Sequence, residues 1–156
     1  MTEIKQAVKS ICELLNKHQV EYIIIGGFAV IYHGYPRSTA DLDFWYAPTT
    51  ENFIRLIAAF QEHGVDTSDL KTIVFDPDKT YLRIPALGFR TEFLPSLPGF
   101  KSFYEVKKRA DRILLDEVPV SIISYEDLLK NKSTVGRLKD QLDIEELKKR
   151  KENRDK

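Results

Sequence analysis

The chain has 156 residues, 42% of them hydrophobic, which predicts one domain over residues 1–156 with a frayed tail over about 150–156. Lys plus Arg and Asp plus Glu number 24 each, so the net charge indicates no preference for nucleic acid. The single cysteine, Cys12, excludes an intrachain disulfide, and no apolar run reaches the roughly 18 residues of a membrane span, so we expect a cytoplasmic protein.

Hydrophobic periodicity and turn residues then predict the helices and strands. No internal repeat, low-complexity linker or domain boundary interrupts them. The predicted elements are a helix over 3–18, a strand over 22–25, a short helix over 28–33, a strand over 41–46, a helix from about 50 to about 63, strands over 81–84 and 89–93, a helix over 103–111, a hairpin over 113–123 and one long helix from 124 to about 149.

Gly26 and Gly27 separate the first predicted strand from the short helix. Gly26 lies 15 positions before Asp41. A junction of this kind leaves backbone N–H groups free at the start of a helix, where they attract anions. Glycine also lets the backbone approach a phosphate without a Cβ in the way. The junction therefore predicts a phosphate-binding turn.

Two carboxylates, Asp41 and Asp43, stand two residues apart in the next predicted strand. A strand places alternate side chains on one face, so both should point the same way. Without a counter-ion they would repel each other, and one would be driven toward protonation. A divalent cation removes this repulsion, and Mg²⁺ favours one or two carboxylates together with substrate phosphates.

Glu92 is the best candidate for a third carboxylate, because it is the lone acid in the aromatic-flanked strand 89–93. If that strand pairs beside residues 41–46, the three carboxylates can hold two Mg²⁺ ions about 3.5–4 Å apart for in-line phosphoryl transfer. The alternative is that Glu92 is an exposed strand residue paired with Arg83 or Arg90.

The segments Ile25-Gly26-Gly27 and Asp41-Leu42-Asp43-Phe44, with 13 residues between them, resemble the signature of the DNA polymerase β-like nucleotidyltransferase superfamily. Residues 36–43 and the basic stretch 130–140 are similar to small bacterial nucleotidyltransferases of the abortive-infection and minimal-nucleotidyltransferase toxin–antitoxin groups. The resemblance spans about residues 20–145. Gly27 stands where many members carry Ser, and Thr91 stands where an apolar residue is more usual.

This resemblance implies an α/β (α+β) fold in which a mixed β-sheet packs against helices, with the carboxylates at one edge. It also implies transfer of a nucleoside monophosphate from an NTP to an acceptor hydroxyl, with release of pyrophosphate. By match of position, Asp41 and Asp43 would hold both Mg²⁺ ions, and Glu92 would hold the catalytic metal and help activate the hydroxyl. Gly26 and Gly27 would bind the β- and γ-phosphates.

Basic residues should neutralise the triphosphate. Arg37 and Thr39 lie in the loop before Asp41, and Lys132, Arg137 and Lys139 lie on the predicted final helix. Lysine acts on phosphate as a point charge and arginine as a fork. The alternative for the last three is structural pairing with nearby acids of the same helix, namely Glu126, Asp127, Asp140 or Asp143.

We therefore expect an Mg²⁺-dependent enzyme whose acceptor is an RNA end, a protein hydroxyl or a small molecule. A protein partner is compatible with this reading, and a membrane is not expected. One alternative is a nucleotide- or partner-binding module of a toxin–antitoxin-like system with little or no catalysis. Another is a metal-dependent phosphodiesterase or nuclease, against which the Gly26-Gly27 turn argues, since hydrolysis needs no triphosphate pocket.

Overall fold

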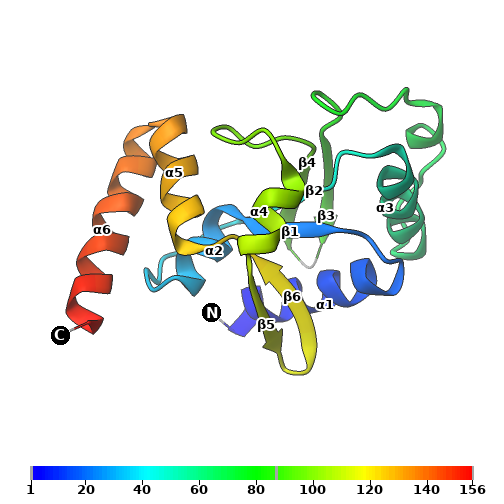
Figure 1. Cartoon of the computed structure of the whole chain (residues 1–156). Helices are drawn as coiled ribbons and strands as arrows, with labels where there is room; N and C mark the ends of the chain where they lie inside the picture. Colours follow the sequence, from blue (N-terminus) through cyan, green and yellow to red (C-terminus); the bar gives the residue numbers. More distant parts are fainter. Residues whose placement is uncertain (1, 87, 156) are drawn as a thin grey trace.

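The computed structural model describes residues 2–86 and 88–155. Within these residues the chain forms six α-helices, six β-strands and one short 3-10 helix (Figure 1). In order they are α1 (Thr2–Lys17), β1 (Tyr22–Ile25), α2 (Gly26–Tyr32), β2 (Asp41–Tyr46), α3 (Thr50–Glu62), η1 (Leu70–Thr72), β3 (Leu82–Ala86), β4 (Phe89–Leu94), α4 (Phe103–Arg109), β5 (Asp111–Leu115), β6 (Val118–Ile122), α5 (Tyr125–Val135) and α6 (Leu138–Arg154).

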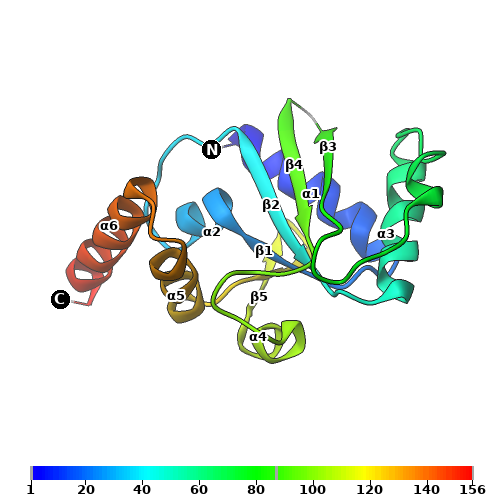
Figure 2. The ribbon, with the colours of Figure 1, turned by 90° about the horizontal axis from the view of Figure 1, so that it is seen from above.

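The strands form one mixed sheet in the order β3-β4-β2-β1-β6-β5. The β2–β4 and β1–β6 pairs are parallel, whereas the β1–β2, β3–β4 and β5–β6 pairs are antiparallel. Figures 1 and 2 both place α5 and α6 side by side at one end of the molecule and α3 at the other. The expected α/β fold with a mixed sheet is confirmed.

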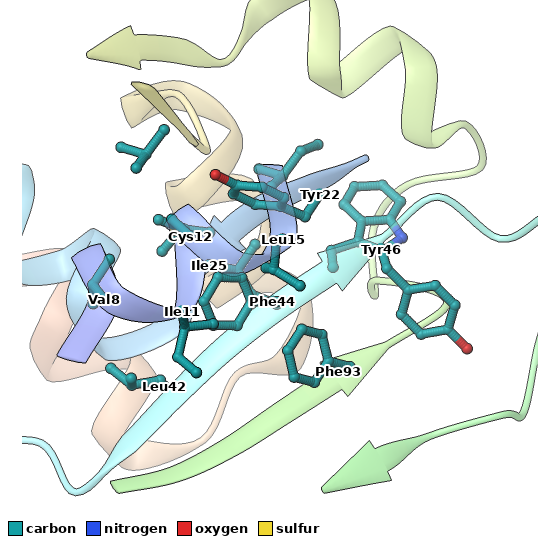
Figure 3. Packing of buried hydrophobic residues seen from close by; sticks show 14 of the residues in the cluster. Val8, Ile11, Cys12, Leu15, Tyr22, Ile25, Leu42, Phe44, Tyr46 and Phe93 are labelled. Carbon is teal, nitrogen blue, oxygen red and sulfur yellow. The ribbon is translucent and has the colours of Figure 1, made fainter. Parts of the chain in front are cut away.

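The core lies between α1 and the central strands. Apolar residues recur along α1 at helical spacing, and Figure 3 shows Val8, Ile11 and Leu15 lying over the sheet. The rings of Phe44 on β2 and Phe93 on β4 stack at 5.0 Å between centroids. Because Leu42 and Phe44 are buried in this core, the alternate residues of β2 emerge on the opposite face.

The prediction of one long C-terminal helix is wrong. α5 ends at Val135, because Gly136 adopts a left-handed conformation (φ 68°) and its N–H donates to the carbonyl of Lys132. Arg137 then caps α6, and the Asp140 carboxylate accepts a hydrogen bond from the Arg137 backbone N–H. The three predicted basic residues therefore lie on three different pieces of backbone: Lys132 on α5, Arg137 in the connection and Lys139 on α6.

α6 folds back along the body of the molecule and continues to Arg154. The Arg154 guanidinium donates a 3.2 Å hydrogen bond to the carbonyl of His33, just after α2. The Arg150 guanidinium lies 5.3 Å from the ring centroid of Tyr35. A charge-assisted hydrogen bond and a cation–π contact thus dock a helix whose surface is mostly charged.

Candidate active site

Three carboxylates meet on the face of the sheet opposite α1. Asp41 and Asp43 lie on β2, and the parallel register of β2 and β4 pairs Asp43 directly with Glu92. Burial raises the pKa of Asp43 to about 7. A hydrogen bond with Glu92 and the charges of Glu92 and Asp41 act in the same direction, and the charge of Lys132 opposes them. The structure therefore brings the three predicted acids together, and the charges of Glu92 and Asp41 disfavour the ionised form of Asp43.

Two arginines partly engage this cluster. Arg90 Nε donates to Asp41 Oδ1 at 2.7 Å, and Arg83 Nη2 lies 3.0 Å from Glu92 Oε1. Both arginine side chains are more than half exposed, at 62% and 56%. Exposed ion pairs contribute only about 0–1 kcal/mol, so these contacts hold the carboxylates weakly. The Arg83–Glu92 pair is the one that the sequence offered as an alternative role for Glu92.

The chemistry of this cluster fits a divalent cation. Within residues 2–86 and 88–155, no three His, Cys, Asp or Glu side chains already stand in an arrangement ready to hold a metal ion. Asp41, Asp43 and Glu92 nevertheless supply the hard oxygen donors that Mg²⁺ prefers. The raised pKa of Asp43 reflects its burial first and then the neighbouring charges of Glu92 and Asp41, both of which a bound cation would offset.

At both glycines a neighbouring side chain leaves no room for a Cβ. Gly26 has a left-handed backbone (φ 67°), and a Cβ on it would collide with the carboxylate of Asp43. A Cβ on Gly27 would lie 2.6 Å from Thr39 Oγ1. The turn at the start of α2 thus packs directly against the strand and loop that carry the first two carboxylates.

An ionic network lies across the cavity from the carboxylates, and its members Lys132, Asp140 and Asp143 are buried. Lys132 Nζ lies 3.2 Å from Asp140 Oδ1 and 2.9 Å from Asp143 Oδ2. The Arg37 guanidinium donates hydrogen bonds to the Asp143 carboxylate through Nε and Nη2, at 3.0 and 3.1 Å. The Arg137 guanidinium bonds the Asp140 carboxylate through the same two atoms, at 2.8 and 3.2 Å. Three cations therefore share two carboxylates, which leaves one positive charge in excess.

Asp140 and Asp143 are parts of this site that the sequence named only as alternative ion-pair partners. They are three residues apart on α6, so they face the same side of that helix. Both side chains are 2% exposed. In the sequence, the signal that these two acids act together was their spacing. Their contacts with Lys132, and the contact of Asp143 with Arg37, depend on how α6 folds back, which the sequence pattern does not give.

All ten predicted site residues line one cavity of about 280 Å³. It lies between the sheet, the start of α2 and the α5–α6 connection. Its other lining residues are Ile25, Leu94, Leu97, Pro98, Asn131, Val135 and Asp140, and the ten predicted ones are Gly26, Gly27, Arg37, Thr39, Asp41, Asp43, Glu92, Lys132, Arg137 and Lys139.

The model of a protein family described as nucleotidyl transferase of unknown function (DUF2204) matches residues 4–155. The chain belongs to this family of nucleotidyl transferases. No curated protein matches it significantly. The family match covers every residue that lines the cavity and supports nucleotidyl transfer, with an NTP as substrate.

In this nucleotidyl transferase the cavity has chemically different walls. Acidic residues occupy the sheet side. Basic residues occupy the loop before β2 and, together with Asp140, the helical side. Uncharged residues occupy the end of β4 and part of α5. No helix within residues 2–86 and 88–155 has both the length and the apolar character needed to cross a membrane.

Proposed function

We propose that the chain is an Mg²⁺-dependent nucleotidyltransferase of the DNA polymerase β-like type, related to the small bacterial abortive-infection and minimal nucleotidyltransferases. It transfers a nucleoside monophosphate from an NTP to an acceptor hydroxyl. The observation that carries this proposal is the meeting of Asp41, Asp43 and Glu92 in a cavity that is also lined by four basic side chains.

The carboxylates form the reaction side of the cavity. Two bound Mg²⁺ ions would supply Lewis-acid stabilisation of the oxygens around the reacting phosphorus. Asp41 and Asp43 would hold both ions, and Glu92 would hold the catalytic one. The acceptor oxygen bonds to the α-phosphorus while the bond to the bridging oxygen breaks, and pyrophosphate leaves. Glu92 would take the hydroxyl proton, directly or through water.

The basic residues form the triphosphate side. Gly26 and Gly27 keep side-chain carbons out of the floor of the cavity, so that phosphate oxygens can reach the backbone and the Thr39 hydroxyl. Positive charge around this floor comes from Arg37, Lys132, Arg137 and Lys139. A charge-assisted contact to phosphate is about twice as strong as a neutral one.

A second candidate is a nucleotide- or partner-binding module of a toxin–antitoxin-like system with little or no turnover. The observation that favours it is the pairing of Asp41 with Arg90 and of Glu92 with Arg83, because both carboxylates already have cationic partners. In the transferase, bound metal ions would displace these exposed arginines from the carboxylates. In the binding module the arginine–carboxylate pairs would remain.

The test is Mg²⁺-dependent release of pyrophosphate from each NTP, followed by incubation with α-labelled NTPs and host lysate. Label in RNA, protein or a small molecule would identify the acceptor. The double variant Asp41→Ala/Asp43→Ala is the control, and labelling that persists in it would assign the activity to another source. Nucleotide binding without pyrophosphate release or label transfer would favour the binding module.

A further inference from the structure

Asn131 is a polar residue in the otherwise apolar part of the cavity. It lies on α5 directly before Lys132, and its neighbours in the lining include Leu94, Leu97 and Val135. Its side chain is buried, with 9% of the residue exposed. A buried amide is costly unless its donors and acceptor are satisfied, so the partners of Asn131 need to be identified one by one.

One end of the Asn131 amide is accounted for. Its Nδ2 donates a 3.0 Å hydrogen bond to the carbonyl of Pro98. A carbonyl can only accept, so the amide nitrogen must be the end that faces Pro98, which fixes the orientation of the group. The oxygen, Oδ1, therefore lies at the other end.

Oδ1 receives no hydrogen bond from any residue of the described parts, 2–86 and 88–155. Within those parts, Thr91 Oγ1 is the one fully buried side-chain polar atom that has no hydrogen-bond partner, so Asn131 Oδ1 is not fully buried. The Asn131 oxygen is therefore still accessible, and the cavity that Asn131 lines is where a ligand would meet it.

Asn52 shows what a purely structural buried asparagine looks like in this fold. Its Oδ1 accepts from the backbone N–H of Glu21 at 2.8 Å, and its Nδ2 donates to the carbonyls of Glu21 and Ala47. Asn52 thus bonds at both ends of its amide, whereas Asn131 bonds only at its nitrogen. This difference indicates that the Asn131 oxygen is available to bond a ligand.

The position of the uncharged wall indicates which part of an NTP would reach Asn131. Leu94 follows Glu92 by two residues on β4, so both share one face of the strand. A nucleoside attached to an α-phosphate at the carboxylates would pass along this wall, while the triphosphate lies against the basic residues. Accepting the proposed function, we infer that Asn131 Oδ1 accepts a hydrogen bond from the nucleoside of the NTP and thereby selects the nucleotide.

The donor would be either an N–H group of the base or a hydroxyl of the ribose, and the test separates them. Dissociation constants are measured for ATP, CTP, GTP and UTP and for their 2′- and 3′-deoxy forms, with Mg²⁺ present. We expect the wild type to discriminate by about tenfold in one of these series, as the net value of one hydrogen bond implies. A base donor separates the four NTPs, and a ribose donor separates each NTP from a deoxy form.

Asn131→Leu, which removes the acceptor, should abolish that discrimination. Asn131→Asp keeps an oxygen acceptor while losing the bond to Pro98, so it should retain the discrimination even if all affinities fall. Val135→Ala, in the same wall, should change all nucleotides alike. Loss of packing or of the Pro98 contact should weaken the binding of all nucleotides alike, so a change in the ratio between nucleotides separates recognition from a structural role.

Thermal unfolding confirms that each variant is folded at the temperature of the measurement. An undiscriminating wild type, or equal ratios in the wild type and Asn131→Leu, would overturn the inference while leaving nucleotidyl transfer intact. A wild type that binds no NTP at all would instead overturn the proposed function, and the inference with it.

Discussion

The hydroxyl of Thr39 occupies the space that a side chain on Gly27 would need, 2.6 Å from the ideal Cβ position. Gly27 is buried at the start of α2 and does not share the left-handed backbone of Gly26. Close approach of Thr39, and not backbone conformation, therefore explains the glycine. The contact joins two segments of the cavity, and the same hydroxyl also bonds the backbone of Asp41 at 3.2 and 3.3 Å.

Gly27→Ser should destabilise the protein by about 1–3 kcal/mol, the usual cost of forcing atoms into a packed site. Thr39→Gly removes the colliding atoms, so the double variant should lose less stability than the two single changes added together. Urea unfolding of the four proteins measures this coupling. A Gly27→Ser variant as stable as the wild type would show that Thr39 moves aside freely.

Asp43→Asn should make the protein more stable when divalent cations are removed with a chelator, because it removes a buried carboxyl group that is costly to ionise and relieves repulsion from Glu92 and Asp41. Mg²⁺ should raise the melting temperature of the wild type, since a ligand that binds only the folded state stabilises it. The variant should lose most of this response, together with pyrophosphate release. Equal Mg²⁺ responses in both proteins would contradict a metal site at Asp43.

Asp143→Asn should cost about 3 kcal/mol of the free energy of unfolding, because it leaves Lys132 and Arg37 buried without their shared carboxylate. The matched control is Glu146→Gln on the same helix, where the side chains of Glu146 and Arg150 are 34% and 42% exposed. That change should cost less than about 0.5 kcal/mol. Similar losses in the two variants, measured by urea unfolding, would show that burial does not decide the value of these pairs.

The sequence predicted the parts of this site that follow from local periodicity better than those that depend on contacts between distant residues. Alternation along β2 placed Asp41 and Asp43 on one face, and the lone acid of β4 identified Glu92, because strand periodicity is local. The break at Gly136 was missed because a glycine inside a helical pattern is often tolerated. Pairing of the basic residues with Asp140 or Asp143 was the alternative that the sequence offered, and the structure shows it for Lys132 with both acids and for Arg137 with Asp140. The pair of Asp143 with Arg37 was missed, because the two residues lie 106 positions apart in the chain.

His33 gives the fold a pH dependence outside the cavity. Its ring Nε2 donates to the carbonyl of Ile123 at 2.7 Å, and the ring packs against Tyr32 and Tyr125. Burial lowers the pKa of His33, with Arg154 acting the same way and the Ile123 hydrogen bond, Asp111 and Glu126 opposing it. The unfolded chain therefore takes up a proton more readily than the folded one, so stability should fall as the pH drops through about 6.5.

His33→Gln keeps an N–H donor for Ile123 and removes the titrating ring. The free energy of unfolding, measured at about pH 7.5 and about pH 5.5, should therefore fall less in this variant than in the wild type. Comparing the two differences cancels the groups that titrate alike in both proteins. An identical fall would mean that His33 accepts its proton in the fold as readily as in the unfolded chain.

Thr91→Val should stabilise the protein by about 1 kcal/mol, because Thr91 Oγ1 is sealed in the core without a hydrogen-bond partner within residues 2–86 and 88–155. Valine has nearly the same shape and loses only the unsatisfied hydroxyl. The control is Thr80→Val, since Thr80 is also buried but its Oγ1 accepts a 2.7 Å hydrogen bond from the backbone N–H of Asp76. That change should destabilise the protein, so the two variants should shift the midpoint of urea unfolding in opposite directions. A loss of stability in Thr91→Val would indicate that an ordered water satisfies the hydroxyl, next to the strand position that carries Glu92.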